Sequence, residues 1–125
     1  MLFKKDNLMV SIKNNSIEVK EGNYHGRIIG VDIKVDQPTQ YGFKDILQLE
    51  VEVDTGVTEI TKNTSYYISD KEGTRFSKFL DDMKIDRQLD VFDVDELLNM
   101  KVEVIIKNNK VADKIYTNID RIIAI

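Results

Sequence analysis

The sequence predicts a mainly β fold, a small five-stranded barrel with a helical connection between its third and fourth strands. Apolar and polar residues alternate along most of the chain, as they do in strands that bury one face. Between residues 73 and 98 the apolar residues change to a helical spacing, and the alternation then returns in two final strands. Turn-forming residues separate these segments.

Length and composition fit one soluble domain. The chain has 125 residues, a net charge of −4 and no cysteine. The missing cysteines exclude disulfides, thiolate metal sites and cysteine nucleophiles, and they are compatible with the reducing cytoplasm that we expect as its location. The sequence shows no apolar run of about eighteen residues and no signal peptide, so no membrane partner is expected.

The domain is predicted to span residues 21–125. Residues 1–20 alternate only weakly around an Asn-Asn pair and are expected to form an N-terminal arm or an extra edge hairpin. The first long strand, "YHGRIIGVDIKVD" (24–36), carries apolar residues of one parity up to Ile28 and of the other from Ile29 onward. Such a change beside Gly26 and Gly30 predicts a bulge or a sharp coil, although a strand buried on both faces would give the same pattern.

The second and third strands form a predicted hairpin. Residues 37–42, "QPTQYG", have loop composition, and "FKDILQLEVEVD" (43–54) then alternates cleanly. "TGVTEITKNTSYYIS" (55–69) opens with a glycine turn and completes the hairpin. The residues of the second strand expected to face inward are Phe43, Leu47, Leu49, Val51 and Val53.

The connection that follows is helical. Phe76, Phe79, Leu80 and Met83 are spaced as one stripe of a helix over 73–85. A short helix at 93–98 begins with a capping-box pattern, Asp93 with Glu96, and Asn99 suits a left-handed C-cap.

Two strands, 101–107 and 110–125, close the chain, with Asn108 and Asn109 as the predicted turn. Three meandering strands, a helical connection and a terminal hairpin are the element order of the OB-fold, a five-stranded Greek-key barrel. An α+β sheet with helices on one face is the alternative.

In this order and in several of its phrases the chain resembles the small OB-fold single-stranded-DNA-binding proteins of phages and mobile elements. The similar phrases are "EGNYHGRIIGVD", a loop with a "YG" pair, "DILQLEVEVD", "FSKFLDDM", "DVDELLNMKVEVIIK" and "KIYTNIDRI". The resemblance runs from about Glu21 to Ile123, and Asn99 stands where glycine would be expected. It implies a non-catalytic protein that binds single-stranded DNA during replication or recombination.

No catalytic constellation is visible, so we expect no enzyme and no cofactor. The sole histidine, His25, lies in a strand, and no phosphate-binding glycine loop appears. Residues 81–96 hold seven carboxylates against Lys84 and Arg87, but a calcium loop of the EF-hand type would need a central glycine. This acidic segment is therefore predicted to be a solvated cover of the helical connection, away from the face of the second and third strands.

Binding to single-stranded nucleic acid requires cations along the phosphates and aromatic rings on the bases. Ten residues are candidates to bind nucleic acid, because each has outward parity in its strand or lies near a loop that would bind oligonucleotides in an OB-fold: Arg27, Lys34, Tyr41, Lys44, Lys62, Tyr67, Lys107, Lys110, Lys114 and Tyr116. The direction of Lys62 stays open, because it has the parity of Ile60.

Two functions compete. The first is sequence-tolerant binding of single-stranded DNA, with replication or recombination proteins as further partners. The second is an OB-like protein-interaction module that uses the acidic segment. Strand edges and the N-terminal arm could support a homo-oligomer.

Overall fold

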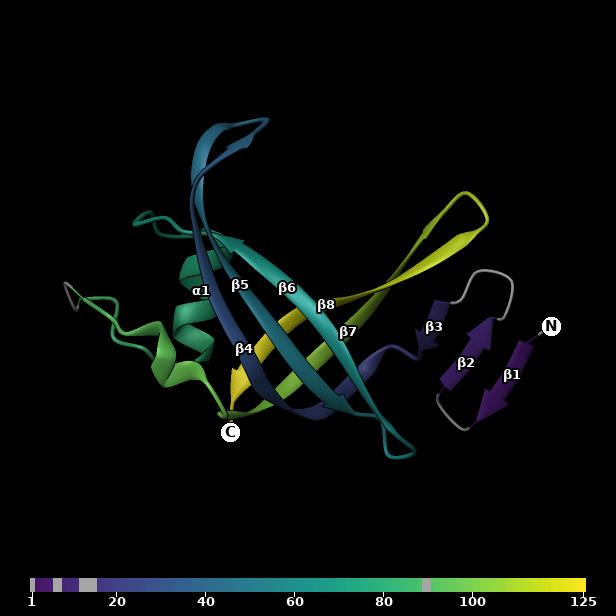
Figure 1. The fold of residues 1–125 in the computed structure, drawn as a ribbon. Helices are drawn as coiled ribbons and strands as arrows, with labels where there is room; N and C mark the ends of the chain where they lie inside the picture. The colour runs from purple at the N-terminus through teal and green to yellow at the C-terminus, as the bar shows by residue number, and fades with distance from the viewer. Residues whose placement is uncertain (1, 6–7, 12–15, 89–90) are drawn as a thin grey trace.

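The computed structural model of the chain describes residues 2–5, 8–11, 16–88 and 91–125, with side chains from Val19 onward (Figure 1). Three short strands form a small antiparallel sheet in the order β1-β2-β3: β1 (Leu2–Lys5), β2 (Leu8–Ser11) and β3 (Ser16–Val19). The prediction of an arm or hairpin at 1–20 falls partly on residues outside those described. Figure 1 shows this small sheet to one side of the larger one.

The larger sheet has five antiparallel strands in the order β6-β5-β4-β7-β8. Its elements follow the chain as β4 (Gly22–Thr39), β5 (Gly42–Asp54), β6 (Glu59–Tyr67), helix α1 (Arg75–Asp82), the 3-10 helix η1 (Val94–Leu97), β7 (Lys101–Val111) and β8 (Lys114–Ala124). The predicted mainly β fold and the helical connection between the third and fourth strands are confirmed. The sheet is open, because strand pairing does not join its outer strands β6 and β8 in the described residues.

The long first strand of this sheet, β4, carries the predicted bulge. Its register against β5 shifts between Ile28 and Gly30, which leaves Ile29 as the extra residue. An added Cβ at Gly26 would lie 2.8 Å from the carbonyl oxygen of Glu52, so only glycine allows the two backbones to approach this closely. The change of apolar parity in the sequence therefore reports a real bulge.

The hairpin that joins β4 to β5 is longer than predicted. Strand pairing continues to Thr39 and Gly42, so the expected loop at 37–42 shrinks to a turn at its end. The hairpin projects beyond the body of the sheet (Figure 1). Phe43, predicted to face inward, is 75% exposed, because among the described residues no helix or strand covers its face at this distance from the core.

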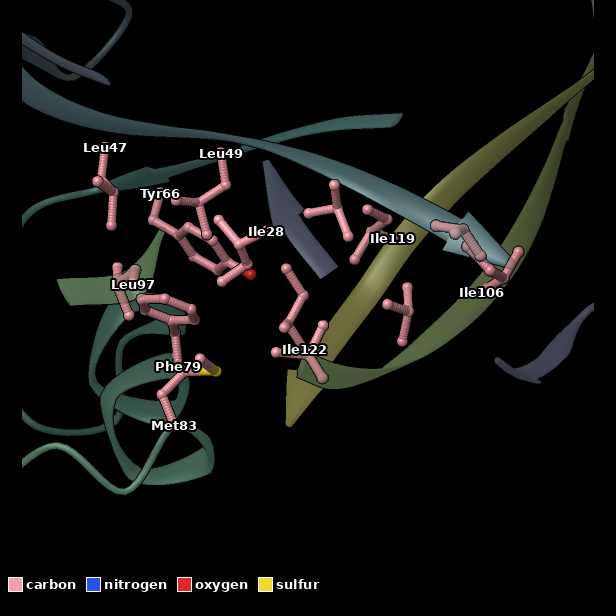
Figure 2. Close-up of a cluster of buried hydrophobic side chains, with 14 of the residues drawn as sticks. Ile28, Leu47, Leu49, Tyr66, Phe79, Met83, Leu97, Ile106, Ile119 and Ile122 are labelled. Carbon is pink, nitrogen blue, oxygen red and sulfur yellow. The ribbon is translucent and has the colours of Figure 1, made fainter. Parts of the chain in front are cut away.

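The core covers the inner face of the curved sheet, and one end of it packs against α1 while Ile106 and Ile119 lie among the strands away from the helix (Figure 2). Leu47, Leu49, Val51 and Val53 are buried as predicted. From the helix, Phe79 and Met83 are buried and Phe76 and Leu80 pack against them, which confirms the predicted stripe. Thr74 caps α1 by accepting a hydrogen bond from the Ser77 amide, 3.1 Å away.

The connection from α1 to β7 follows the sequence pattern closely. The carboxylate of Asp93 accepts a hydrogen bond from the Asp95 amide at the start of η1. Asn99 has a φ of 69° and its amide donates to the carbonyl of Ile28, 2.7 Å away, while the Ile28 amide donates to the carbonyl of Met100. The predicted left-handed cap thus also attaches the connection to β4 at the bulge.

The turn between β7 and β8 was predicted wrongly. Asn108 and Asn109 lie within β7, opposite Thr117 and Tyr116, and the turn lies at residues 112 and 113. The Asn108 side chain donates to the carbonyl of Val19 and accepts from the Thr117 hydroxyl. Asparagine here joins the N-terminal segment to the sheet, a long-range role that its turn propensity conceals.

Candidate nucleic-acid interface

A groove forms where the tip of the β4–β5 hairpin, the end of β6 and the start of α1 meet. Its volume is about 680 Å³, and we call it the tyrosine groove. The Ile68 amide donates to the carbonyl of Asp45, 2.9 Å away, which holds the chain leaving β6 against β5. The groove is lined by Tyr41, Lys44, Ile46, Gln48, Ser65, Tyr66, Tyr67, Ile68, Ser69, Lys71, Thr74, Arg75 and Phe76.

Two exposed tyrosines stand at this groove. Strand alternation turns Tyr66 into the core and its neighbour Tyr67 outward, and the outward direction of Tyr67 is the one expected from its parity. Tyr41, in the turn between β4 and β5, is 68% exposed, and Tyr67 is 46% exposed. Their ring centroids are 6.4 Å apart at an interplanar angle of 76°, so one edge meets the other face. Both rings keep surface free for a ligand.

The charge of the groove is positive. Its lining includes Lys44, Lys71 and Arg75 and no carboxylate, although Asp70 and Glu72 flank Lys71 in the chain. Sequence reasoning selected Tyr41, Lys44 and Tyr67 but missed Lys71 and Arg75. Their only local signal is a place just before α1 for Lys71 and at its first residue for Arg75, which does not reveal that the connection folds back beside the hairpin.

Arg75 is held by the protein itself. Its guanidinium donates to the carbonyl of Ser65 and to the Thr64 hydroxyl in β6, and also to the carbonyl of Ile119 in β8. It lies 4.1 Å from the centroid of the Tyr66 ring, in cation–π geometry. Arg75 therefore links the two outer strands of the open sheet and fixes a positive charge at the groove wall.

The acidic segment does not line the groove. Asp82 pairs with Arg121 of β8, with 2.7 Å between Oδ1 and Nη2, and Asp81 pairs with Arg87 at 3.0 Å. The described carboxylates of 81–96 lie on α1 and on the connection to β7, as predicted, whereas Asp90 falls outside the described residues. The described carboxylates of this segment are thus kept on the helical connection and out of the groove lining.

The other candidates do not join Tyr41, Lys44 and Tyr67 in the groove. Arg27 lies in a separate hollow and pairs with Glu52 at 3.7 Å. Lys34 is exposed on β4 opposite Ile46, and Lys62 is half-buried on the parity of Ile60. Four residues are exposed on the β7–β8 hairpin, but its turn lies beyond the position predicted for it: Lys107, Lys110, Lys114 and Tyr116.

The buried hydroxyl of Tyr66 should make stability sensitive to alkali. Burial raises the pKa of Tyr66 above its ordinary value of 10.0, and the nearby Arg75 offsets part of this effect. Above pH 10 the unfolded chain loses this proton while the folded chain keeps it, so the free energy of unfolding should fall as the pH rises. Urea titrations between pH 9 and 11 should show this decrease, and Tyr66→Phe should reduce it; an unchanged pH dependence in that variant would contradict the assignment.

Other sites and relatives give no further direction. Within the described chain, no group of three His, Asp or Glu side chains is placed to hold a metal ion. None of the helices in the described segments is both long and apolar enough to span a bilayer. No protein-family model matches the sequence, and a search of curated proteins finds no match.

Proposed function

We propose that the protein binds single-stranded DNA, without catalysis and with little sequence preference, and that the tyrosine groove is the centre of its binding surface. One observation carries the proposal: two exposed tyrosine rings share a groove with three cations and no carboxylate in its lining. Aromatic rings stack on any base and cations hold any phosphate, so this combination suits an unpaired strand of arbitrary sequence.

We also propose that the fold is an OB-like barrel. The support is its connectivity, in which the long bent β4 pairs with β5 on one edge and β7 on the other. Arg75 bridges β6 and β8 at the remaining gap. OB-folds bind oligonucleotides on the face of their second and third strands and at the loops beside it, and the tyrosine groove lies at that place.

Within the groove the tyrosines and the cations would have different roles. Tyr41 and Tyr67 would stack on neighbouring bases, and Lys44 and Lys71 would contact the phosphates beside them. Arg75 would act mainly through its fixed charge, because its donors already serve the protein. A duplex keeps its bases stacked inside and offers them to neither ring, so it should bind weakly.

The biological setting follows from the sequence resemblance alone. We propose a cytoplasmic role in replication or recombination of phage or mobile-element DNA, together with proteins of those pathways.

Fluorescence anisotropy of a labelled oligo-dT at several salt concentrations tests the proposal. Phosphate contacts from Lys44 and Lys71, or from these two and Arg75, should give a slope of log K against log salt of about −1.4 to −2.1, that is about −0.7 per contact. A duplex of equal length is the control. Absence of binding at low salt would overturn the proposal and favour the protein-interaction module that uses the acidic segment.

A further inference from the structure

In the second half of strand β4, one of the two edges has no partner strand among the described residues. β5 covers one edge of β4 from His25 to Thr39, but β7 covers the other only from Gly22 to Arg27. Asn99 and Met100 add two hydrogen bonds at Ile28. Beyond that point, no strand of the described chain pairs with this second edge. An open edge of this length is a template for another strand.

The backbone groups on this edge can be assigned. The amide and the carbonyl of Ile28 both face it, since they bond to Met100 and Asn99. The bulge residue Ile29 shifts the alternation by one, so the same groups of Val31 and Ile33 face the edge beyond it. Those of Val35 follow in the same alternation, at the start of a second register shift between Lys34 and Gln37, where Asp36 has a φ of 52°. Among the described residues, the only hydrogen bond found there is from the Gln37 side chain to the carbonyl of Val35, 2.9 Å away.

Along this stretch of β4, apolar side chains lie on one face of the strand and charged side chains on the other. Ile33 is 40% exposed and Val35 is 61% exposed, so the apolar face continues from the core into solvent. Asp32 and Lys34 lie on the opposite face, and within the described chain neither takes part in an ion pair. The stretch therefore offers an uncovered apolar face and two unpaired charges of opposite sign.

We propose that a second copy of this chain pairs with this edge, antiparallel and about a two-fold axis at Ile33. In that register Ile33 faces the partner's Ile33, and Val31 faces the partner's Val35. Asp32 then faces the partner's Lys34, twice in each dimer, because a two-fold interface repeats every contact. Apolar residues meet apolar residues on one face and opposite charges meet on the other.

The charges of Asp32 and Lys34 favour this register over the registers shifted by one position. A two-fold axis at Asp32 would place two aspartates opposite each other, and an axis at Lys34 would do the same with two lysines. An axis between residues would oppose apolar to charged side chains and turn the apolar faces of the two copies to opposite sides of the sheet. The axis at Ile33 also makes hydrogen-bonded pairs of the residues whose amides and carbonyls face the edge.

Charge exchange tests the register. Sedimentation velocity from about 1 µM to about 200 µM should show a reversible dimer, because interfaces at the small end of the size range dissociate at such concentrations. Asp32→Lys or Lys34→Asp alone should weaken the dimer at least about tenfold, since each replaces two attractions by two repulsions. The double variant restores the opposite charges and should recover the dimer. A monomer at every concentration, or a dimer insensitive to both single changes, would overturn the proposal.

Crosslinking gives a second measurement that needs no weakened variant. The chain has no cysteine, so Ile33→Cys introduces a single thiol on the two-fold axis. Paired residues in antiparallel strands have Cα atoms about 5.5 Å apart, within reach of a disulfide. Val35→Cys is the matched control. Residue 35 is more exposed than residue 33, but in this register it faces the partner's Val31, so the two copies of residue 35 would be offset by four positions along the strands, about 13 Å. Oxidation should link the first variant and not the second; equal linking of both would refute the register. DNA binding by the tyrosine groove is measured separately and could survive failure of the dimer.

Discussion

Replacement of Tyr67 by alanine is expected to weaken binding of single-stranded DNA by about 5- to 150-fold. Stacking of one base on an aromatic ring contributes about 1–3 kcal/mol, and each 1.4 kcal/mol changes affinity tenfold. Tyr67 is 46% exposed at the groove and packs edge-to-face with Tyr41, so its removal also releases the second ring. Anisotropy titrations with oligo-dT measure the change.

Tyr116→Ala is the matched comparison for this experiment. Tyr116 is 49% exposed, close to the value of Tyr67, but it lies on the β7–β8 hairpin outside the tyrosine groove. If the groove carries binding, this variant should keep an affinity within about twofold of the parent, as surface changes away from a site usually do. A larger loss from Tyr116→Ala than from Tyr67→Ala would move the binding surface to that hairpin.

Replacement of Phe79 by alanine is expected to cost the fold about 3–5 kcal/mol. The Phe79 ring is 3% exposed and stacks on Tyr66 with 4.5 Å between centroids (Figure 2). It joins α1 to the sheet, so its loss leaves a cavity that neither element can fill without moving. Domains of this size have about 5–15 kcal/mol of stability in total, and thermal unfolding should therefore begin roughly 10–20 °C lower. Calorimetry or circular dichroism measures this shift.

Phe43→Ala is the control for this measurement. The sequence predicts both side chains to face the core, Phe43 from strand alternation and Phe79 from helical spacing, but Phe43 is 75% exposed on the projecting hairpin. Its removal should change the free energy of unfolding by less than about 0.5 kcal/mol at low protein concentration. A large destabilisation by Phe43→Ala would mean that the hairpin packs against the body in solution.

Local sequence patterns determined most of the secondary structure. The parity change around Gly30 predicted the bulge, and the spacing of Phe76, Phe79 and Met83 predicted the helix. Parity also predicted that Tyr67 faces outward, and it is 46% exposed. These features depend on which side of one strand or helix a residue occupies, and that side is fixed by backbone geometry within a few residues.

Only the tertiary structure decided what covers each face. Ile33 and Phe43 have the parity of the core, but they lie on a hairpin that extends past α1 and the neighbouring strands. Asn108 has turn chemistry, but its bonds to Val19 and Thr117 place it inside a strand. Lys71 and Arg75 join Tyr41 and Tyr67 because the chain folds back after β6. Such contacts join residues far apart in the sequence, and a local pattern records the face that a residue occupies but not the partner that meets it.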